Sequence, residues 1–167
     1  MLTYESSASI NAALEIVWRA LSDVTHWDHW TPTVTKVHAL DQSELGLGNR
    51  FKVHQPDLRP AIWSVTAIQT PSSFTWESRS PGMVMIAEHT LQRSAEGRTE
   101  LTLRFSFRGV LGAIFGRLSK SLVEGYLATE AVSLRRHVEA LSGISQSAAS
   151  HCPPSRTSPS NANSRDP

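Results

Sequence analysis

The order of the periodic segments constrains the fold of this chain more than any other feature of the sequence. Residues Leu2–Ile10 alternate between apolar and polar side chains, which predicts a half-buried strand. Residues Asn11–Asp23 carry apolar side chains at helical spacing, and Asn11 is a candidate N-cap. The last periodic segment, Val110–Ser142, predicts a long helix that ends at Gly143. Strands are therefore expected only at the start and in the middle of the chain.

Six further strands are predicted between the two helices, each bounded by glycine or proline turns. Connections as short as these join antiparallel neighbours, because parallel strands need long crossovers. The sequence thus predicts an α+β fold in which an antiparallel meander curls around a long helix and encloses space. The six strands are Thr33–Leu40, Asn49–Gln55, Ala61–Gln69, Ser73–Ser80, Met83–Gln92 and Thr99–Arg108.

The C-terminal helix carries two apolar stripes and an unusual number of glycines in its first turns. Gly109, Gly112 and Gly116 each disfavour a helix by up to ~1 kcal/mol relative to alanine. They indicate either a close approach of the backbone to the sheet or a loop that becomes helical only near Ile114. One stripe comprises Leu111, Phe115, Leu118, Leu122 and Tyr126, and the other comprises Leu127, Ala131, Leu134, Val138 and Leu141.

Composition describes an ordinary globular protein and excludes several classes of partner. The chain has 167 residues, 40% of them hydrophobic, with 16 basic and 15 acidic side chains. That balance gives no electrostatic footprint for nucleic acid or for an anionic membrane. No apolar run approaches the length of a membrane span, and the N-terminus lacks the pattern of a secretory signal. A cytoplasmic protein without an integral membrane segment is expected.

The residues after the last helix differ in character from the rest of the chain. Residues 143–167 are rich in serine and proline and carry little that a core could bury, so this tail is predicted to be disordered. The lone cysteine, Cys152, falls in the tail, has no partner for an internal disulfide, and reads as an incidental thiol. Residues 1–142 are expected to form one folded domain.

Several short motifs lie along the predicted elements. They are Ser9–Ala12, Glu15–Trp18, Leu21–Val24, Trp27, Trp30–Pro32, Gly48 before Phe51, Phe74 and Trp76 after Pro71, Glu88–Thr90, Arg98–Thr102 and Phe107–Gly109. Together they resemble the motifs of the START-related (SRPBCC) polyketide cyclase/dehydrase and lipid-transport superfamily, which has the Bet v 1-like helix-grip fold. The resemblance covers about residues 1–142.

This resemblance implies a curved seven-stranded antiparallel sheet around the C-terminal helix, with a short helical region after strand 1 that plugs one end. A cavity between the sheet and the long helix would be the ligand-binding site. Alternation along the strands, together with the first helix stripe, selects the side chains expected to line it. They are Phe51, Val53, Phe74, Trp76, Met85, Ala87, His89, Leu101, Leu103, Phe105, Phe115, Leu118, Leu122 and Tyr126.

His89 is the polar side chain that stands out among these apolar neighbours. It can donate to a ligand carbonyl or act as a general acid or base near neutral pH. Tyr126 offers a phenolic donor, and Gln55 and Ser78 are candidates whose direction depends on the strand register. The loop Pro56–Pro60 and the segment Ser80–Met83 are candidate gates.

No pattern in the sequence predicts a metal or a cofactor. His26, Asp28 and His29 lie on one turn between tryptophans without an evident fourth ligand, and they read as a polar turn rather than a zinc site. The folded part lacks a nucleophile elbow, a phosphate-binding loop and a cysteine pair.

Three functions remain open. The first is binding of a small hydrophobic ligand such as a lipid, a polyketide or an aromatic metabolite. The second, which the superfamily implies, is a polyketide cyclase or dehydratase that uses His89 as the acid/base and Tyr126 to orient a carbonyl. The third is a protein-interaction module that uses the outer face of the sheet and the tail.

Overall fold

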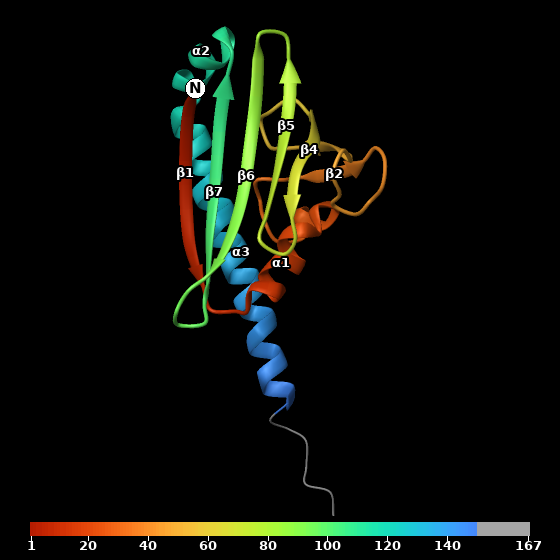
Figure 1. Ribbon diagram of the computed structural model, residues 1–167, viewed down its shortest axis with the longest axis vertical. Coiled ribbons are helices and arrows are strands. Elements are labelled where there is room, and N and C mark those ends of the chain that lie inside the picture. Colours follow the sequence, from red (N-terminus) through yellow and green to blue (C-terminus); the bar gives the residue numbers. More distant parts are fainter. Residues whose placement is uncertain (150–167) are drawn as a thin grey trace, which may run out of the picture.

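A computed structural model describes residues 1–149 of the chain, and their side chains through residue 143. It contains seven strands and, in the same part of the chain, three α-helices and one 3-10 segment (Figure 1). In chain order these are β1 (Leu2–Ile10), α1 (Leu14–Ser22), η1 (Val24–His29), β2 (Lys36–Ala39), β3 (Arg50–His54), β4 (Ala61–Gln69), β5 (Ser73–Ser80), β6 (Met83–Arg93), β7 (Thr99–Arg108), α2 (Val110–Leu118) and α3 (Lys120–Ala149).

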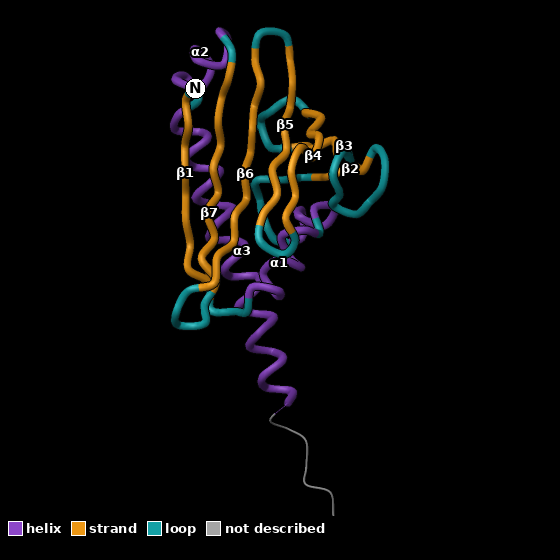
Figure 2. The backbone as a smooth tube through the Cα atoms, viewed as in Figure 1, coloured by secondary structure: helices purple, strands orange, loops and turns teal. Residues whose placement is uncertain are grey.

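The strands form one antiparallel sheet in the order β1-β7-β6-β5-β4-β3-β2. From β2 to β7, strands that are consecutive in the sequence are neighbours, as the short turns predict, whereas β1 pairs with β7 and lies at the opposite edge from β2. A register shift between Val65 and Ala67 on β4 marks an irregularity of the kind that bends a strand. The sheet turns sharply in the β4–β3–β2 region (Figure 2). This is the curved seven-stranded helix-grip sheet predicted from the sequence.

The core lies between the concave face of the sheet and α3. The helix packs chiefly against β1 and β7, while α1 packs against α3 and β6, and η1 against β2. In Figure 1, α3 runs behind β1 and β7 and continues below the sheet. Side chains from all of these elements are fully buried, among them Ile10, Leu21, Trp27, Phe51, Phe74, Leu101 and Leu134.

The short helical region after β1 is present, although its start differs from the prediction. Helix α1 begins at Leu14, Ala13 occupies the N-cap position, and no side chain caps the helix. The backbone N–H of Asn11 instead donates to Glu139 Oε1 of α3, at 2.9 Å. The predicted capping role of Asn11 is therefore wrong, because an acceptor from α3 meets this segment before the helix begins.

Strand β2 is the strand whose predicted bounds were least accurate. It covers only Lys36–Ala39, whereas Thr33–Leu40 was expected. The hydroxyls of Thr31 and Thr33 are buried and bond to each other at 2.8 Å. Their side chains thus organise the chain before β2 as a local turn, which hydroxyl side chains favour over strand pairing.

The C-terminal helical segment begins at Val110, as predicted, but it is divided. A break at Ser119 separates α2 from α3. Of the two explanations for the glycines, close approach is correct. A Cβ on Gly112 would lie 3.4 Å from Phe107 Cβ, and one on Gly116 would lie 2.7 Å from Leu2 Cδ2. The glycines therefore let α2 approach β7 and β1.

The far end of the segment also differs from the prediction. Helix α3 continues to Ala149, so Gly143 does not end it. A residue enriched at helix C-termini is a weak signal where no proline follows at once. The rest of the predicted tail, including Cys152, lies outside the described residues.

Replacement of Gly109, which begins α2, is expected to destabilise the fold. Gly109 has φ +91°, and an alanine Cβ there would press against the Gly82 carbonyl oxygen. The substitution Gly109→Ala should lower the free energy of unfolding by about 1–3 kcal/mol. Tryptophan fluorescence during urea denaturation measures this change.

Gly125→Ala is the matched control, because a Cβ at this position in α3 meets no atom within 4 Å. It should raise the free energy of unfolding by about 0.5–1 kcal/mol through helix propensity alone. Equal effects of the two variants would contradict the structural role assigned to Gly109.

Candidate functional site

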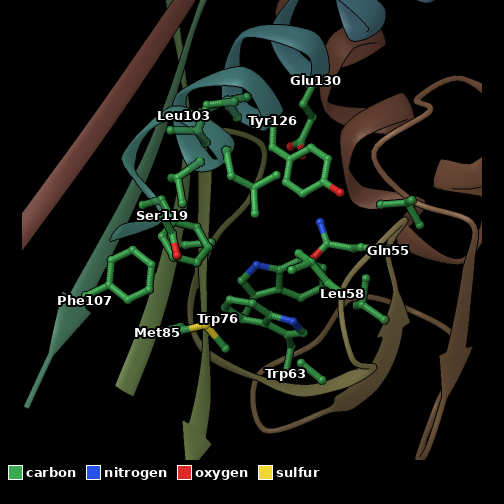
Figure 3. A pocket seen from close by; sticks show the side chains of 18 of the residues that line it. Gln55, Leu58, Trp63, Trp76, Met85, Leu103, Phe107, Ser119, Tyr126 and Glu130 are labelled. Carbon is green, nitrogen blue, oxygen red and sulfur yellow. The ribbon is translucent and has the colours of Figure 1, made fainter. Parts of the chain in front are cut away.

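A cavity of about 250 Å³ lies between the sheet and α3. Its walls come from β3 to β7, from η1, and from the α2–α3 segment, and the β3–β4 loop borders it. In Figure 3, Tyr126 and Glu130 reach from the helix toward Trp63 and Trp76 on the opposite wall. Leu58, Phe115 and Leu122 line the cavity and are themselves exposed, so the cavity opens to solvent beside them.

Ten of the fourteen side chains selected from the sequence line this cavity. The four that do not line it fall into two groups. Phe51, Phe74 and Leu101 point to the concave side but are fully buried in the core, and Leu118 is 80% exposed on α2. The ten lining residues are Val53, Trp76, Met85, Ala87, His89, Leu103, Phe105, Phe115, Leu122 and Tyr126.

The expectation that Leu118 faces the sheet is incorrect, and helix periodicity explains why. Gly112 and Gly116 lie against the sheet, and the buried stripe continues through Val123 and Leu127. At 3.6 residues per turn, Leu118 then points to nearly the opposite side of the helix. The large apolar side chains of the first stripe led to the prediction that their side of the helix is buried. In the structure the buried side is instead the one that carries Gly112 and Gly116.

Aromatic rings form most of one wall of the cavity. Trp76 lies with its ring centroid 5.4 Å from that of Trp27 and 5.4 Å from that of Trp63. The centroids of Trp63 and Phe105 are 5.9 Å apart. Trp27 is fixed by its indole N–H, which donates to the Leu21 carbonyl at 3.0 Å. The tryptophan of the helical plug is therefore also a cavity wall, a role that the sequence analysis did not assign to it.

His89 lies at the buried end of the cavity and is held by its aromatic neighbours. Its ring stacks on Phe74 with a centroid separation of 4.2 Å and an interplanar angle of 6°. Phe74 is the cross-strand partner of His89 in the β5–β6 ladder, so the pairing of the sheet sets this stack. The ring of Trp27 lies 5.5 Å from it on another side.

Glu130 is the partner of His89 and is the functional candidate that the sequence analysis missed. His89 Nε2 lies 3.3 Å from Glu130 Oε1, and both side chains are largely buried. A signal was available, because Glu130 follows Tyr126 by four residues and therefore lies on the same helix face. The contact joins β6 to α3 across the cavity.

Three buried polar atoms at this end of the cavity have no hydrogen-bond partner among the described residues. They are Trp76 Nε1, His89 Nδ1 and Glu130 Oε1. The His89–Glu130 contact has the distance of an ion pair, but its angle is not that of a hydrogen bond. Each unsatisfied buried group costs about 1–3 kcal/mol. A ligand that bonds to them would recover part of that cost.

Tyr126 is committed to a different contact from the one expected. Its hydroxyl donates to the Pro56 carbonyl of the β3–β4 loop at 2.6 Å. Burial, and then the nearby charge of Asp57, raises the pKa of the Tyr126 phenol above its ordinary value. The phenol is therefore a neutral donor at physiological pH, and it ties α3 to the loop at the cavity mouth. Gln55, from the same loop, also lines the cavity, whereas Ser78 is buried outside it.

Two negative findings apply to residues 1–149. No three histidine, cysteine, aspartate or glutamate side chains lie close enough together to hold a metal ion. His26, which lies beside Trp27 in η1 and was considered as a metal ligand, hydrogen-bonds through Nδ1 to Asp23 Oδ1 at 2.7 Å. Within the same residues, no helix has both the length and the apolarity needed to cross a membrane.

Solved structures of low sequence identity share the fold. XoxI from Bacillus cereus aligns with a TM-score of 0.67 at 13% identity, over 85% of this chain and 99% of its own. Norcoclaurine synthase from Thalictrum flavum, as a point mutant in complex with a transition state analogue, gives 0.68 at 11%, over 84% and 96%. The di-domain aromatase/cyclase (ARO/CYC) BexL gives 0.63 at 16%, over 85% of this chain and 48% of BexL.

The solved structures establish only the fold, whereas a comparison of sequences assigns the chain to a family. No curated protein matches the sequence. A family model described as polyketide cyclase / dehydrase and lipid transport, however, matches residues 1–139. That range includes every strand, and it includes both members of the His89–Glu130 pair. The chain therefore belongs to the polyketide cyclase/dehydrase and lipid-transport family.

Proposed function

We propose that the protein binds a small hydrophobic molecule in the cavity between the sheet and α3. The observation that carries this proposal is the cavity itself, which is walled by aromatic and aliphatic side chains and has unsatisfied polar atoms at its buried end. Ligand sites of this composition bind through apolar contact and use a few polar groups to fix orientation. The family description, which includes both cyclases and lipid transport, is consistent with such a ligand.

The size of the cavity favours a compact ligand. At about 250 Å³ it lies just below the usual range for ligand pockets. An engineered cavity of about 150 Å³ binds benzene, so the present volume suits a molecule of one or two rings. The tryptophan walls offer faces for stacking. An aromatic metabolite or a small polyketide therefore fits better than a long acyl chain, which would have to extend through the mouth.

The β3–β4 loop is the proposed gate. The Tyr126–Pro56 hydrogen bond links this loop to α3 beside Gln55 and Leu58, which line the cavity. Breaking that bond would free one side of the mouth without disturbing the sheet ladder. The second segment considered from the sequence, Ser80–Met83, contributes only Met83 to the lining, so it is the weaker candidate.

The His89–Glu130 pair favours a second candidate function, that of a polyketide cyclase or dehydratase. A histidine and a carboxylate in contact within an apolar wall are suited to move a proton to or from a bound carbonyl compound. In this function His89 is the acid/base, and Glu130 holds its ring and balances its charge. Tyr126 would have to release Pro56 before it could orient a carbonyl.

Ligand binding is tested with 2-naphthol and naphthalene as probes. Saturating probe should raise the melting temperature, because a ligand at a hundred times its Kd stabilises the native state by about 2.7 kcal/mol. 2-Naphthol should bind more tightly than naphthalene, since its hydroxyl can pair with the unsatisfied polar atoms. Thermal denaturation and calorimetry measure both effects, and native mass spectrometry of fresh protein would reveal a co-purified ligand.

The control compares the same substitution inside and outside the cavity. Met85→Trp adds bulk to the lining and should abolish the probe-induced shift, whereas Ile62→Trp, at a half-exposed site away from the lining, should preserve it. An equal shift in both variants would place the probe elsewhere. No shift in the unaltered protein, with a wide panel of lipids and aromatics, would support the interaction-module alternative.

Loss of the Tyr126 hydroxyl should loosen the proposed gate. Tyr126→Phe removes the bond to Pro56 and should lower the free energy of unfolding by about 0.5–1.5 kcal/mol. Amide hydrogen exchange in the β3–β4 loop should accelerate. Tyr4→Phe is the matched control, because it removes a phenol bond to the Gly116 carbonyl of α2. If both variants change amide hydrogen exchange in the β3–β4 loop equally, the Tyr126–Pro56 hydrogen bond does not specifically hold this loop.

The catalytic alternative is tested once a substrate that cyclises has been identified. His89→Ala and Glu130→Gln should each lower kcat by about 10²–10⁴-fold while the circular dichroism spectrum persists. Glu124→Gln, an exposed carboxylate on the same helix, should leave kcat unchanged. Normal turnover by the His89 variant would remove this residue from the mechanism and leave the binding function alone.

A further inference from the structure

Helix α2 presents an apolar face to solvent, which is the reverse of the usual arrangement in a globular protein. Val110 is 79% and Leu118 80% exposed, and four further large apolar side chains are at least two-fifths exposed, namely Leu111, Ile114 and Phe115 of α2 and Leu122 at the start of α3. A singly exposed leucine needs no explanation, but a continuous face does. We call the following residues the apolar face: Val110, Leu111, Ile114, Phe115, Leu118 and Leu122.

The sequence of α2 favours this orientation. Gly112 and Gly116 are buried against Phe107, and Gly116 also meets Leu2. A Cβ on Gly116 would lie 2.7 Å from Leu2 Cδ2, and one on Gly112 would already touch Phe107 at 3.4 Å, so this face has little room for large side chains. At 3.6 residues per turn, the six large side chains occupy the outer and lateral sides of the helix.

The apolar face is continuous with the mouth of the cavity. Phe115 and Leu122 belong to both, and Leu58 of the β3–β4 loop lies across the mouth from them. Leu118 and Leu122 also line a shallow depression beside this mouth. A hydrophobic molecule that leaves the cavity here would therefore emerge onto apolar side chains.

Basic side chains border the apolar face. Arg117 and Lys120 lie on α2 and at the start of α3, and Arg59 follows Leu58 at the mouth. Among the described residues, no carboxylate forms an ion pair with Arg117 or Arg59. Lys120 has only a distant partner, Glu124, at 3.9 Å. The net charge of +1 gives the chain as a whole no attraction to an anionic membrane. An apolar centre with a local basic border is nevertheless complementary to an anionic lipid surface.

We propose that the apolar face of α2 docks on the surface of an anionic lipid bilayer and places the cavity mouth against it. Six apolar side chains would enter the headgroup region, while Arg117, Lys120 and Arg59 contact lipid phosphates and carboxylates. This surface interaction is a property separate from the ligand-binding proposal. A cavity ligand would in this arrangement exchange with the bilayer without crossing bulk water.

A second copy of the chain is a less suitable occupant. The segment from Val110 to Leu122 is about 20 Å long and about 10 Å wide, so its face covers roughly 200 Å². A stable protein interface buries about 800 Å² on each partner. Two such faces would also bring Arg117 and Lys120 of both copies together. A bilayer requires neither a large complementary surface nor an acidic partner residue.

Vesicle flotation with the 167-residue chain tests this proposal. It should float with phosphatidylcholine vesicles that contain about one-third phosphatidylserine, less with pure phosphatidylcholine, and less as salt rises, because ionic attraction is screened. The double variant Ile114→Ser/Leu118→Ser should bind at least about tenfold more weakly, since both apolar side chains would be lost from the interface. Leu47→Ser removes a leucine of the β2–β3 loop whose 69% exposure lies between those of Ile114 and Leu118, and this variant should float normally.

Ile114 and Leu118 do not line the cavity, so the double variant should keep its melting-temperature shift with 2-naphthol. Failure of the docking proposal is thus distinguishable from failure of the binding proposal. Absence of flotation, or equal flotation of the double variant and the unaltered protein, would overturn the docking proposal. A dimer in sedimentation that dissociates in the double variant would overturn it in favour of a second copy.

Discussion

The burial of α3 against only one side of a curved sheet is the constraint on which the cavity depends. Val123, Leu127, Leu134 and Val138 pack chiefly against β1 and β7, while the sheet continues through β6 to β2 and bends away. A straight helix cannot follow that bend, and the far part of the concave face is covered by α1 and η1. Trp27 and the β3–β4 loop close this space only partly, which leaves the cavity.

The glycines of α2, which pack against Phe107, then determine which face of the α2–α3 segment lies against the sheet. Gly112 and Gly116 let α2 lie on Phe107, and the buried stripe of α3 continues in the same phase. The larger residues of the other stripe are consequently displaced toward the cavity and the solvent. Phe115, Leu122 and Tyr126 reach the cavity, whereas Leu118 points away from it.

Local patterns predicted the fold well, because alternation and turn residues encode an antiparallel meander directly. Strands β1, β4, β5 and β7 have the predicted bounds, and the strand faces of Trp76, His89 and Leu103 were correct. The buried face of the C-terminal helix was predicted from the size of its side chains, so Leu118 was wrongly assigned to the cavity lining. Glu130 was missed because its role depends on contact with a strand some forty residues earlier.

The polar atoms that lack a partner lie at one end of the site, and their position bears on both candidate functions. The buried end holds His89, Glu130 and the Trp76 N–H, whereas Leu58 and Phe115 border the mouth together with Gln55 and Arg59, which solvent can reach. A ligand with one polar group and one apolar part is therefore expected to enter with the polar group first. The same orientation would bring a carbonyl to His89 in an enzyme and would leave the apolar part of a carried molecule at the exit. Binding and catalysis thus require the same pose, and they differ only in whether the His89–Glu130 pair transfers a proton.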